Sequence, residues 1–151
     1  RPSECTPSIQ RYFSIRHNKP WKTLEARINF LNLCPASSQD GMPSLINAIA
    51  NGAGMCDAPT LNVINRDHIG GYGDTEGTPV ISNRMPRHCA TYFNHPWTRL
   101  KESAPRYVGT PTTGGRWVEA AEFERALAQY KARMEAEARR REREQRWSGG
   151  N

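Results

Sequence analysis

Proline placement constrains this chain more than any other feature of its sequence. All 11 prolines lie between residues 2 and 111, at intervals of 5 to 20 residues, and the last 40 residues contain none. Proline ends helices and lacks the N–H donor that a central strand needs. We therefore expect a mostly irregular or extended fold with short α-helices and little β-structure. The proline-free end is expected to form one long C-terminal α-helix over about residues 116–146.

The residues that build a hydrophobic core are scarce. Leu, Ile, Val and Phe together make up 23 of the 151 residues, about 15%. Below roughly 20%, the burial of such side chains hardly offsets the conformational entropy that a chain loses on folding. No apolar run approaches the roughly 18 residues that a membrane-spanning helix needs, so we expect no transmembrane segment. The sequence also indicates no cofactor.

Short elements are expected within the region 1–111, between the prolines. Apolar residues at helical spacing predict helices over 20–33 and 43–51, and a third over 86–95 that Pro96 ends. The run Leu61-Asn62-Val63-Ile64 predicts a strand, and a second strand is expected at 79–81. The glycine-rich stretch between these strands, including Asp67-His68-Ile69-Gly70, is most simply a turn.

The segment 112–147 is expected to be an amphipathic helix with a charged end, followed by a frayed tail at 148–151. Its apolar residues recur every three or four positions, so one face is built to pack. Beyond that face, Glu and Arg four residues apart support the helix in solvent. We predict that the apolar face binds a partner protein through Trp117, Phe123, Leu127, Tyr130 and Met134.

The four cysteines, Cys5, Cys34, Cys56 and Cys89, all lie in the first 90 residues. An even number allows two disulfides with three possible pairings. The spacing matches no known disulfide framework, and buried free thiols are slightly favoured over bridges. Structural zinc sites supply ligands in close pairs, which this sequence lacks.

One stretch carries residue types used in catalysis. Asp67 and His68 are adjacent, Asn83 follows, and Asn94-His95 comes later. This pattern partly resembles the HNH nuclease family, in which a metal ion and a histidine base cleave a phosphodiester. The resemblance implies that Asp67 and His95 (or Asn94) bind the metal, that His68 is the general base, and that Asn83 orients it. A metal-dependent endonuclease is therefore the alternative function.

The leading interpretation uses the whole chain. Single aromatic residues along a proline-broken backbone are typical of a chain that inserts side chains into pockets of other proteins. We expect a non-catalytic accessory or structural subunit of a large multiprotein complex, whose partners are other subunits, or RNA if the complex is a ribosome. The arginine richness and the first residue, Arg1 rather than Met, favour a mitochondrial location. A respiratory complex, ATP synthase or the mitochondrial ribosome is the first expectation.

Overall fold

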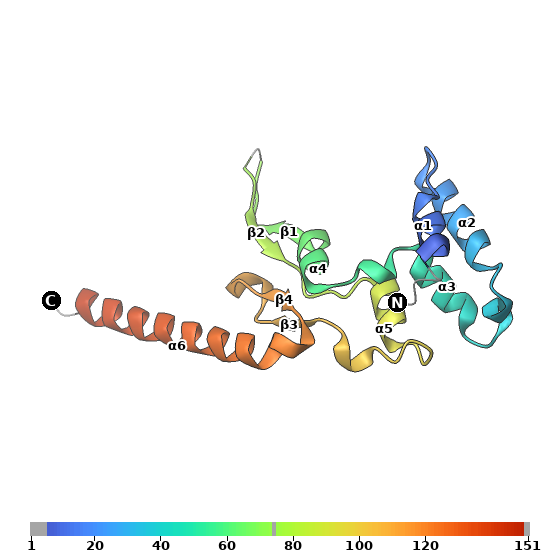
Figure 1. Ribbon diagram of the computed structural model, residues 1–151. Coiled ribbons are helices and arrows are strands. Elements are labelled where there is room, and N and C mark those ends of the chain that lie inside the picture. Colours follow the sequence, from blue (N-terminus) through green and yellow to red (C-terminus); the bar gives the residue numbers. More distant parts are fainter. Residues whose placement is uncertain (1–5, 74, 150–151) are drawn as a thin grey trace. The chain divides into compact units, whose positions relative to one another are not determined.

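The computed structural model describes residues 6–73 and 75–149 (Figure 1). Contacts between residues divide the chain into two compact units. Unit 1 contains the described residues up to Cys56 together with Met85–Lys101, and unit 2 contains Asp57–Arg84 together with the described residues from Glu102 onward. The chain therefore leaves unit 1 after Cys56, returns at Met85, and leaves again after Lys101.

Unit 1 is built from four helices: α1 (Thr6–Ser14), α2 (Pro20–Leu31), α3 (Met42–Ala50) and α5 (Arg87–Asn94). Helix α3 is central, because it contacts both α2 and α5 and buries Leu45 and Ile46. The Tyr12 hydroxyl donates to the Ile49 carbonyl at 3.1 Å and so attaches α1 to α3. Short 3₁₀ turns at Pro35–Ser38 and Ala53–Met55 complete the unit.

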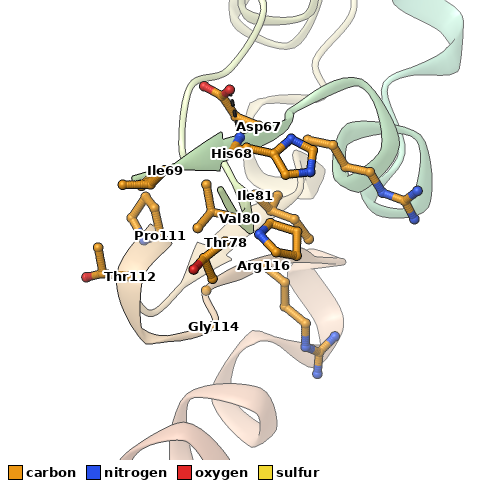
Figure 2. A pocket seen from close by; sticks show the side chains of 13 residues that line it. Asp67, His68, Ile69, Thr78, Val80, Ile81, Pro111, Thr112, Gly114 and Arg116 are labelled. Atoms are coloured by element: carbon orange, nitrogen blue, oxygen red, sulfur yellow. Dashed lines mark hydrogen bonds between the residues drawn. The ribbon is translucent and has the colours of Figure 1, made fainter. Parts of the chain in front are cut away.

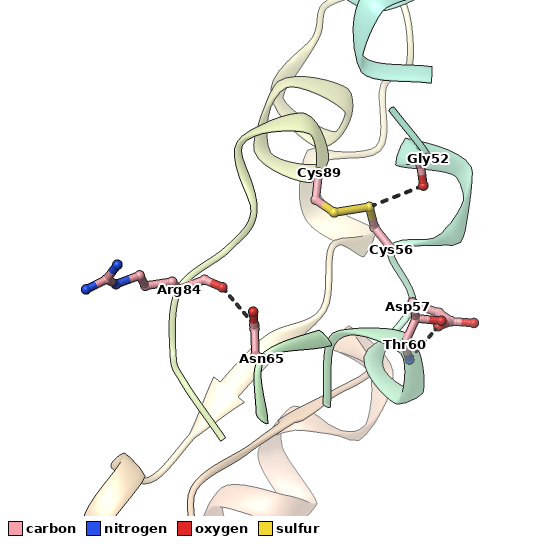
Figure 3. The surroundings of a disulfide bond; sticks show 7 residues. All are labelled: Gly52, Cys56, Asp57, Thr60, Asn65, Arg84 and Cys89. Carbon is pink, nitrogen blue, oxygen red and sulfur yellow. Dashed lines mark hydrogen bonds between the residues drawn. A yellow bond between two sulfur atoms is a disulfide. The ribbon is translucent and has the colours of Figure 1, made fainter. Parts of the chain in front are cut away.

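A disulfide joins Cys56 to Cys89 within unit 1 (Figure 3). Cys56 follows the Ala53–Met55 turn, Cys89 lies in α5, and both side chains are buried. The expectation of buried free thiols is therefore wrong for this pair, because the fold brings together two sulfurs that are 33 residues apart in sequence. Cys34 is a free, exposed cysteine, and Cys5 lies outside the described residues.

Unit 2 contains helix α4 (Ala58–Ile64), two antiparallel hairpins and the long helix α6 (Phe123–Ser148). The first hairpin pairs β1 (Arg66–Ile69) with β2 (Thr78–Ile81), and the second pairs β3 (Arg106–Val108) with β4 (Arg116–Val118). The first turns of α6 pack on the β3–β4 hairpin, and the helix continues well beyond it (Figure 1). Short 3₁₀ turns lie at Lys101–Ser103, Pro111–Thr113 and Ala120–Glu122.

The small core of unit 2 lies between that hairpin and α6. Val108 and Val118 from the two strands and Ala126 from the helix are buried, and partly buried Phe123, Leu127 and Tyr130 pack against them. The guanidinium of Arg106 lies 3.6 Å from the centre of the Phe123 ring, so its planar face covers the edge of this core.

Two predicted local structures are wrong. Residues 61–64 form the end of helix α4 rather than a strand. The Asp57 side chain accepts a hydrogen bond from the Thr60 N–H at 2.9 Å, and Pro59 lies in the first turn, so the helix has a capped start (Figure 3). The Asp67-His68-Ile69 stretch is not a turn, because it forms β1 and pairs with β2.

The expected fold class is confirmed: short helices, one long C-terminal helix and little β-structure. Helix α6 begins at Phe123 rather than near 116, because Arg116–Val118 pairs as a strand before the chain turns into the helix. Ser148 is the last residue of α6, and the end of the expected frayed tail, at 150–151, lies outside the described residues. Among the described residues, no helix is both long and apolar enough to cross a membrane.

Candidate functional site

The two hairpins of unit 2 are held together by a few specific hydrogen bonds. The Asn62 side chain of α4 pairs with the backbone of Trp117: its oxygen accepts from the Trp117 N–H at 2.7 Å and its amide donates to the Trp117 carbonyl at 3.0 Å. The Trp117 indole donates to the Ser82 carbonyl at 3.0 Å, and the Tyr107 hydroxyl donates to the Ile81 carbonyl at 2.7 Å. These bonds fix the end of β2 beside the β3–β4 hairpin.

The connection between β3 and β4 is equally well fixed. Thr110 and Thr113 hydrogen-bond each other around the 3₁₀ turn Pro111–Thr113. From α6, the Tyr130 hydroxyl lies 2.8 Å from the Thr113 hydroxyl, and the Arg133 guanidinium donates to the Thr113 carbonyl at 2.7 Å. Helix α6 therefore acts as a support for this loop.

Glycine is required at one position of the loop. A Cβ atom on Gly115 would overlap the Tyr107 hydroxyl and lie 2.6 Å from the Thr110 carbonyl oxygen. Burial raises the pKa of this Tyr107 hydroxyl, with a further contribution from Tyr130. The close approach of Gly115 to Tyr107 allows the loop to run beside the β1–β2 hairpin.

Between the first hairpin and this loop lies an open pocket of about 870 Å³ (Figure 2). Its volume is in the range of ligand-binding cavities in proteins. One wall is formed by both strands of the hairpin and the other by residues of the 111–116 segment. The apolar lining residues are Ile69, Pro79, Val80, Ile81 and Pro111.

The strand register distributes charge unevenly around the pocket. Arg66 pairs with Ile81 and Asp67 with Val80, so alternation places Arg66 and His68 on one face of the hairpin and Asp67 and Ile69 on the other. Arg66 and Arg116 both line the pocket and are exposed. The Asp67 carboxylate accepts a hydrogen bond from the His68 backbone N–H at 2.8 Å (Figure 2). The pocket is therefore apolar inside, with more positive than negative charge around it.

The residues of the nuclease pattern are only partly brought together. Asp67 and His68 line the pocket, whereas Asn83 is exposed after β2 and does not line it. His95 belongs to unit 1, where it is buried with only 8% of its surface exposed. Its Nε2 lies 2.7 Å from the Gly41 carbonyl oxygen, and its Nδ1 accepts from the Trp97 N–H. Both ring nitrogens of His95 are thus used in stabilising unit 1.

The predicted partner-binding stripe lies mostly against the chain's own hairpin. Trp117 is buried in β4 with its ring edge-on to Tyr107, and Phe123, Leu127 and Tyr130 pack on the unit 2 core. Met134 is partly exposed further along α6. That these five side chains bind a partner stays a prediction.

Several lining residues were not predicted from the sequence. Pro111, Thr112 and Arg116 line the pocket because tertiary hydrogen bonds bring the 111–116 segment beside β2. The adjacent glycines Gly114-Gly115 were the available local signal, since they mark a tight backbone approach.

Another cluster has the residue types of a metal site. Ligand atoms of Cys56, His88 and Cys89 lie within 4.8 Å of one another. Both sulfurs are joined in the disulfide, and only thiolates are effective metal ligands. In this oxidised form, the cluster is a covalent link in unit 1.

Fold and bridge together define a small, mainly helical, disulfide-linked protein. The sequence pattern of the TrbM family matches residues 1–131, and the chain belongs to that family. No curated protein and no solved structure matches it.

Family membership corrects the functional expectations. TrbM is a conjugal transfer family of bacterial plasmid origin. The expected subunit of a mitochondrial complex and the mitochondrial location are therefore wrong, and the endonuclease alternative is not retained. Arginine richness and the identity of the first residue misled the interpretation because neither is specific to mitochondrial proteins.

Proposed function

We propose that this protein binds a segment of another conjugal transfer protein in the pocket of unit 2. The observation that carries the proposal is the pocket itself, which combines an apolar interior with Arg66 and Arg116 at its edge. A segment that presents an apolar side chain flanked by carboxylates fits this lining, because buried apolar anchors supply affinity and surrounding charge supplies selectivity.

Binding without catalysis is part of the proposal. In the described residues that line the pocket, no side-chain acid, base and nucleophile hydrogen-bond one another. The Asp67 carboxylate bonds to backbone instead, and the hydroxyls of Thr78 and Thr112 have no base as a hydrogen-bond partner there. Covalent catalysis needs such contacts to activate a nucleophile.

The disulfide supports a location in an oxidising compartment outside the cytoplasm. Stable disulfides form in secreted and periplasmic proteins, whereas cytosolic thiols are kept reduced. The buried Cys56–Cys89 bridge connects the two segments of unit 1 and is therefore part of its fold. Blocking free thiols in intact donor cells tests this directly: Cys34 should be alkylated, and Cys56 and Cys89 should remain linked.

Site-specific photocrosslinking in donor cells tests the pocket. A photoreactive amino acid replaces Ile69, which lines the pocket and is 45% exposed, and in a matched control it replaces Val63 on α4, which is 59% exposed and outside the pocket. We expect a crosslink from position 69 to a protein of the same conjugation system and none from position 63. Equal crosslinking at both positions, or none at either, would refute the proposal.

A further inference from the structure

A second surface, with positive charge that no ion pair among the described residues compensates, lies at the junction of α1 and α2 in unit 1. Residues 7–31 contain five basic side chains and the single acidic residue Glu25. In the part of the chain that the structure describes, the ion pairs all lie at 122–144, so none neutralises this junction. The basic residues are Arg11, Arg16, Lys19, Lys22 and Arg27.

Four of these cations lie near an exposed tryptophan. Trp21 is 58% exposed, and the ammonium groups of Lys19 and Lys22 lie 5.7 and 5.4 Å from the centre of its ring. Trp21 also lines an open pocket of about 590 Å³, whose other lining residues include Arg16 and Arg27. The tryptophan and four of the cations thus share one region of unit 1.

The same pocket contains side-chain donors suited to an anion, because Arg16 and Arg27 line it. Helix α2 begins there at Pro20, which has no N–H, and the backbone N–H groups of Lys22 and Thr23 donate to the Lys19 carbonyl at 3.0 and 3.2 Å, so the helix start contributes its dipole rather than a set of free donors. A helix N-terminus attracts negative charge, most strongly phosphate. Arg27 is partly exposed and adds its positive charge to the pocket, and its guanidinium carbon lies 5.4 Å from the Tyr12 ring centre.

We propose that this basic surface of unit 1, made of Arg16, Lys19, Trp21, Lys22 and Arg27, binds the phosphate headgroups of anionic phospholipids at a membrane surface. Tryptophan favours the boundary between lipid and water, where its ring is apolar and its N–H can hydrogen-bond. Arginine and lysine near an anionic leaflet are attracted to it, and arginine can hold one phosphate with two donors. The exposed Phe13 of α1, 51% accessible, adds apolar area to the same unit.

Sedimentation of the full chain with vesicles tests this inference. One set of vesicles contains phosphatidylcholine alone, and the other contains phosphatidylglycerol at about one lipid in three, which gives the negative surface that basic residues recognise. We expect binding to the anionic vesicles only, with a decrease as salt is raised. Equal binding to both sets, or to neither, would overturn the inference.

Variants identify the surface responsible. Lys19→Glu with Lys22→Glu should weaken binding by more than about tenfold, since each basic residue near an anionic leaflet contributes measurably. The matched control is Arg141→Glu with Arg143→Glu, which makes the same change of charge on exposed positions of α6 and should bind nearly as well as the unmodified protein. Trp21→Ala, at an exposed position, should weaken binding without a change of net charge. If the control weakens binding as much as the lysine pair, the effect is general charge and the inference fails.

Two competitors identify the ligand. Inorganic phosphate at millimolar concentration should displace the protein only partially from the anionic vesicles, because free phosphate offers no boundary between lipid and water into which Trp21 could insert. A single-stranded oligonucleotide that binds more tightly than the anionic vesicles would overturn the lipid assignment. These measurements do not involve the unit 2 pocket, so their failure leaves the crosslinking result unaffected.

Discussion

Removing the Cys56–Cys89 bridge should destabilise unit 1 far more than any single surface change. Replacing both cysteines with alanine keeps the positions apolar, and both are almost completely buried, with 3% and 0% of their surfaces exposed. The main loss of stability therefore comes from removing the covalent constraint on the unfolded chain. The substitution should leave the native packing of α3 against α5 recognisable.

The size of the loss follows from the length of the closed loop. The bridge spans 33 residues, for which the chain-entropy relation gives about 3–4 kcal/mol. With a urea dependence of roughly 1–3 kcal/mol per molar for a small protein, the midpoint should fall by about 2 M. A change of this size is a large part of the total stability of a small domain.

The assay must report on unit 1 specifically. Trp97 belongs to unit 1, and its indole N–H donates to the Asp40 carbonyl at 3.2 Å. The indole signal of Trp97 in proton–nitrogen NMR spectra, followed through a urea titration, therefore monitors this unit. Cys34→Ala is the matched control, because Cys34 is free and exposed. An unchanged midpoint in the double variant, or an equal fall in the control, would refute the reasoning.

Three further predictions concern unit 2. Gly115→Ala should lower the melting temperature in calorimetry, because the new methyl group overlaps the Tyr107 hydroxyl, and unchanged melting would contradict the close approach. Asn62→Ala should cost about 1–3 kcal/mol in urea unfolding, because the Trp117 N–H and carbonyl lose their partner; a loss below about 0.5 kcal/mol would count against the pairing. Hydrogen bonds lower the pKa of the Asp57 carboxyl in the folded protein. The charged carboxylate therefore stabilises α4 fully above the unfolded pKa of about 4, and this stabilisation is lost as the pH falls through the lower pKa of the folded protein. In Asp57→Asn, the protection of α4 amides against exchange should depend less on pH in this acid range. An unchanged pH dependence would refute the prediction.

The helices that the sequence predicted correctly are those with local signals. Helix α2 begins with Pro20, and α6 lies in a segment without proline, where apolar residues repeat at helical spacing. The short run 61–64 was misassigned because four apolar-rich residues fit a strand or a helix equally well. The deciding signal lay upstream, in the Asp57 cap and Pro59.

The candidate site was only partly predictable. Asp67 and His68 attracted attention by residue type, and both line the pocket. The opposite wall depends on pairings such as Asn62 with Trp117 and Tyr107 with Ile81, which join residues 55 and 26 positions apart. Local spacing carries no information on such contacts. The same holds for the cysteines, because their spacing does not show which of them pair, and the fold is what brings Cys56 to Cys89.

The bridge in unit 1 also determines how tension travels along the chain. A pull applied on either side of Cys56 and Cys89 passes through the sulfur–sulfur bond, because that covalent path is much shorter than the 33-residue route between them. Helix α4 and both strands of the first hairpin lie in the bypassed segment and carry no load. The load falls on the elements before Cys56 and after Cys89, so the hairpin wall of the pocket lies off the load path, whereas the 111–116 wall lies on it.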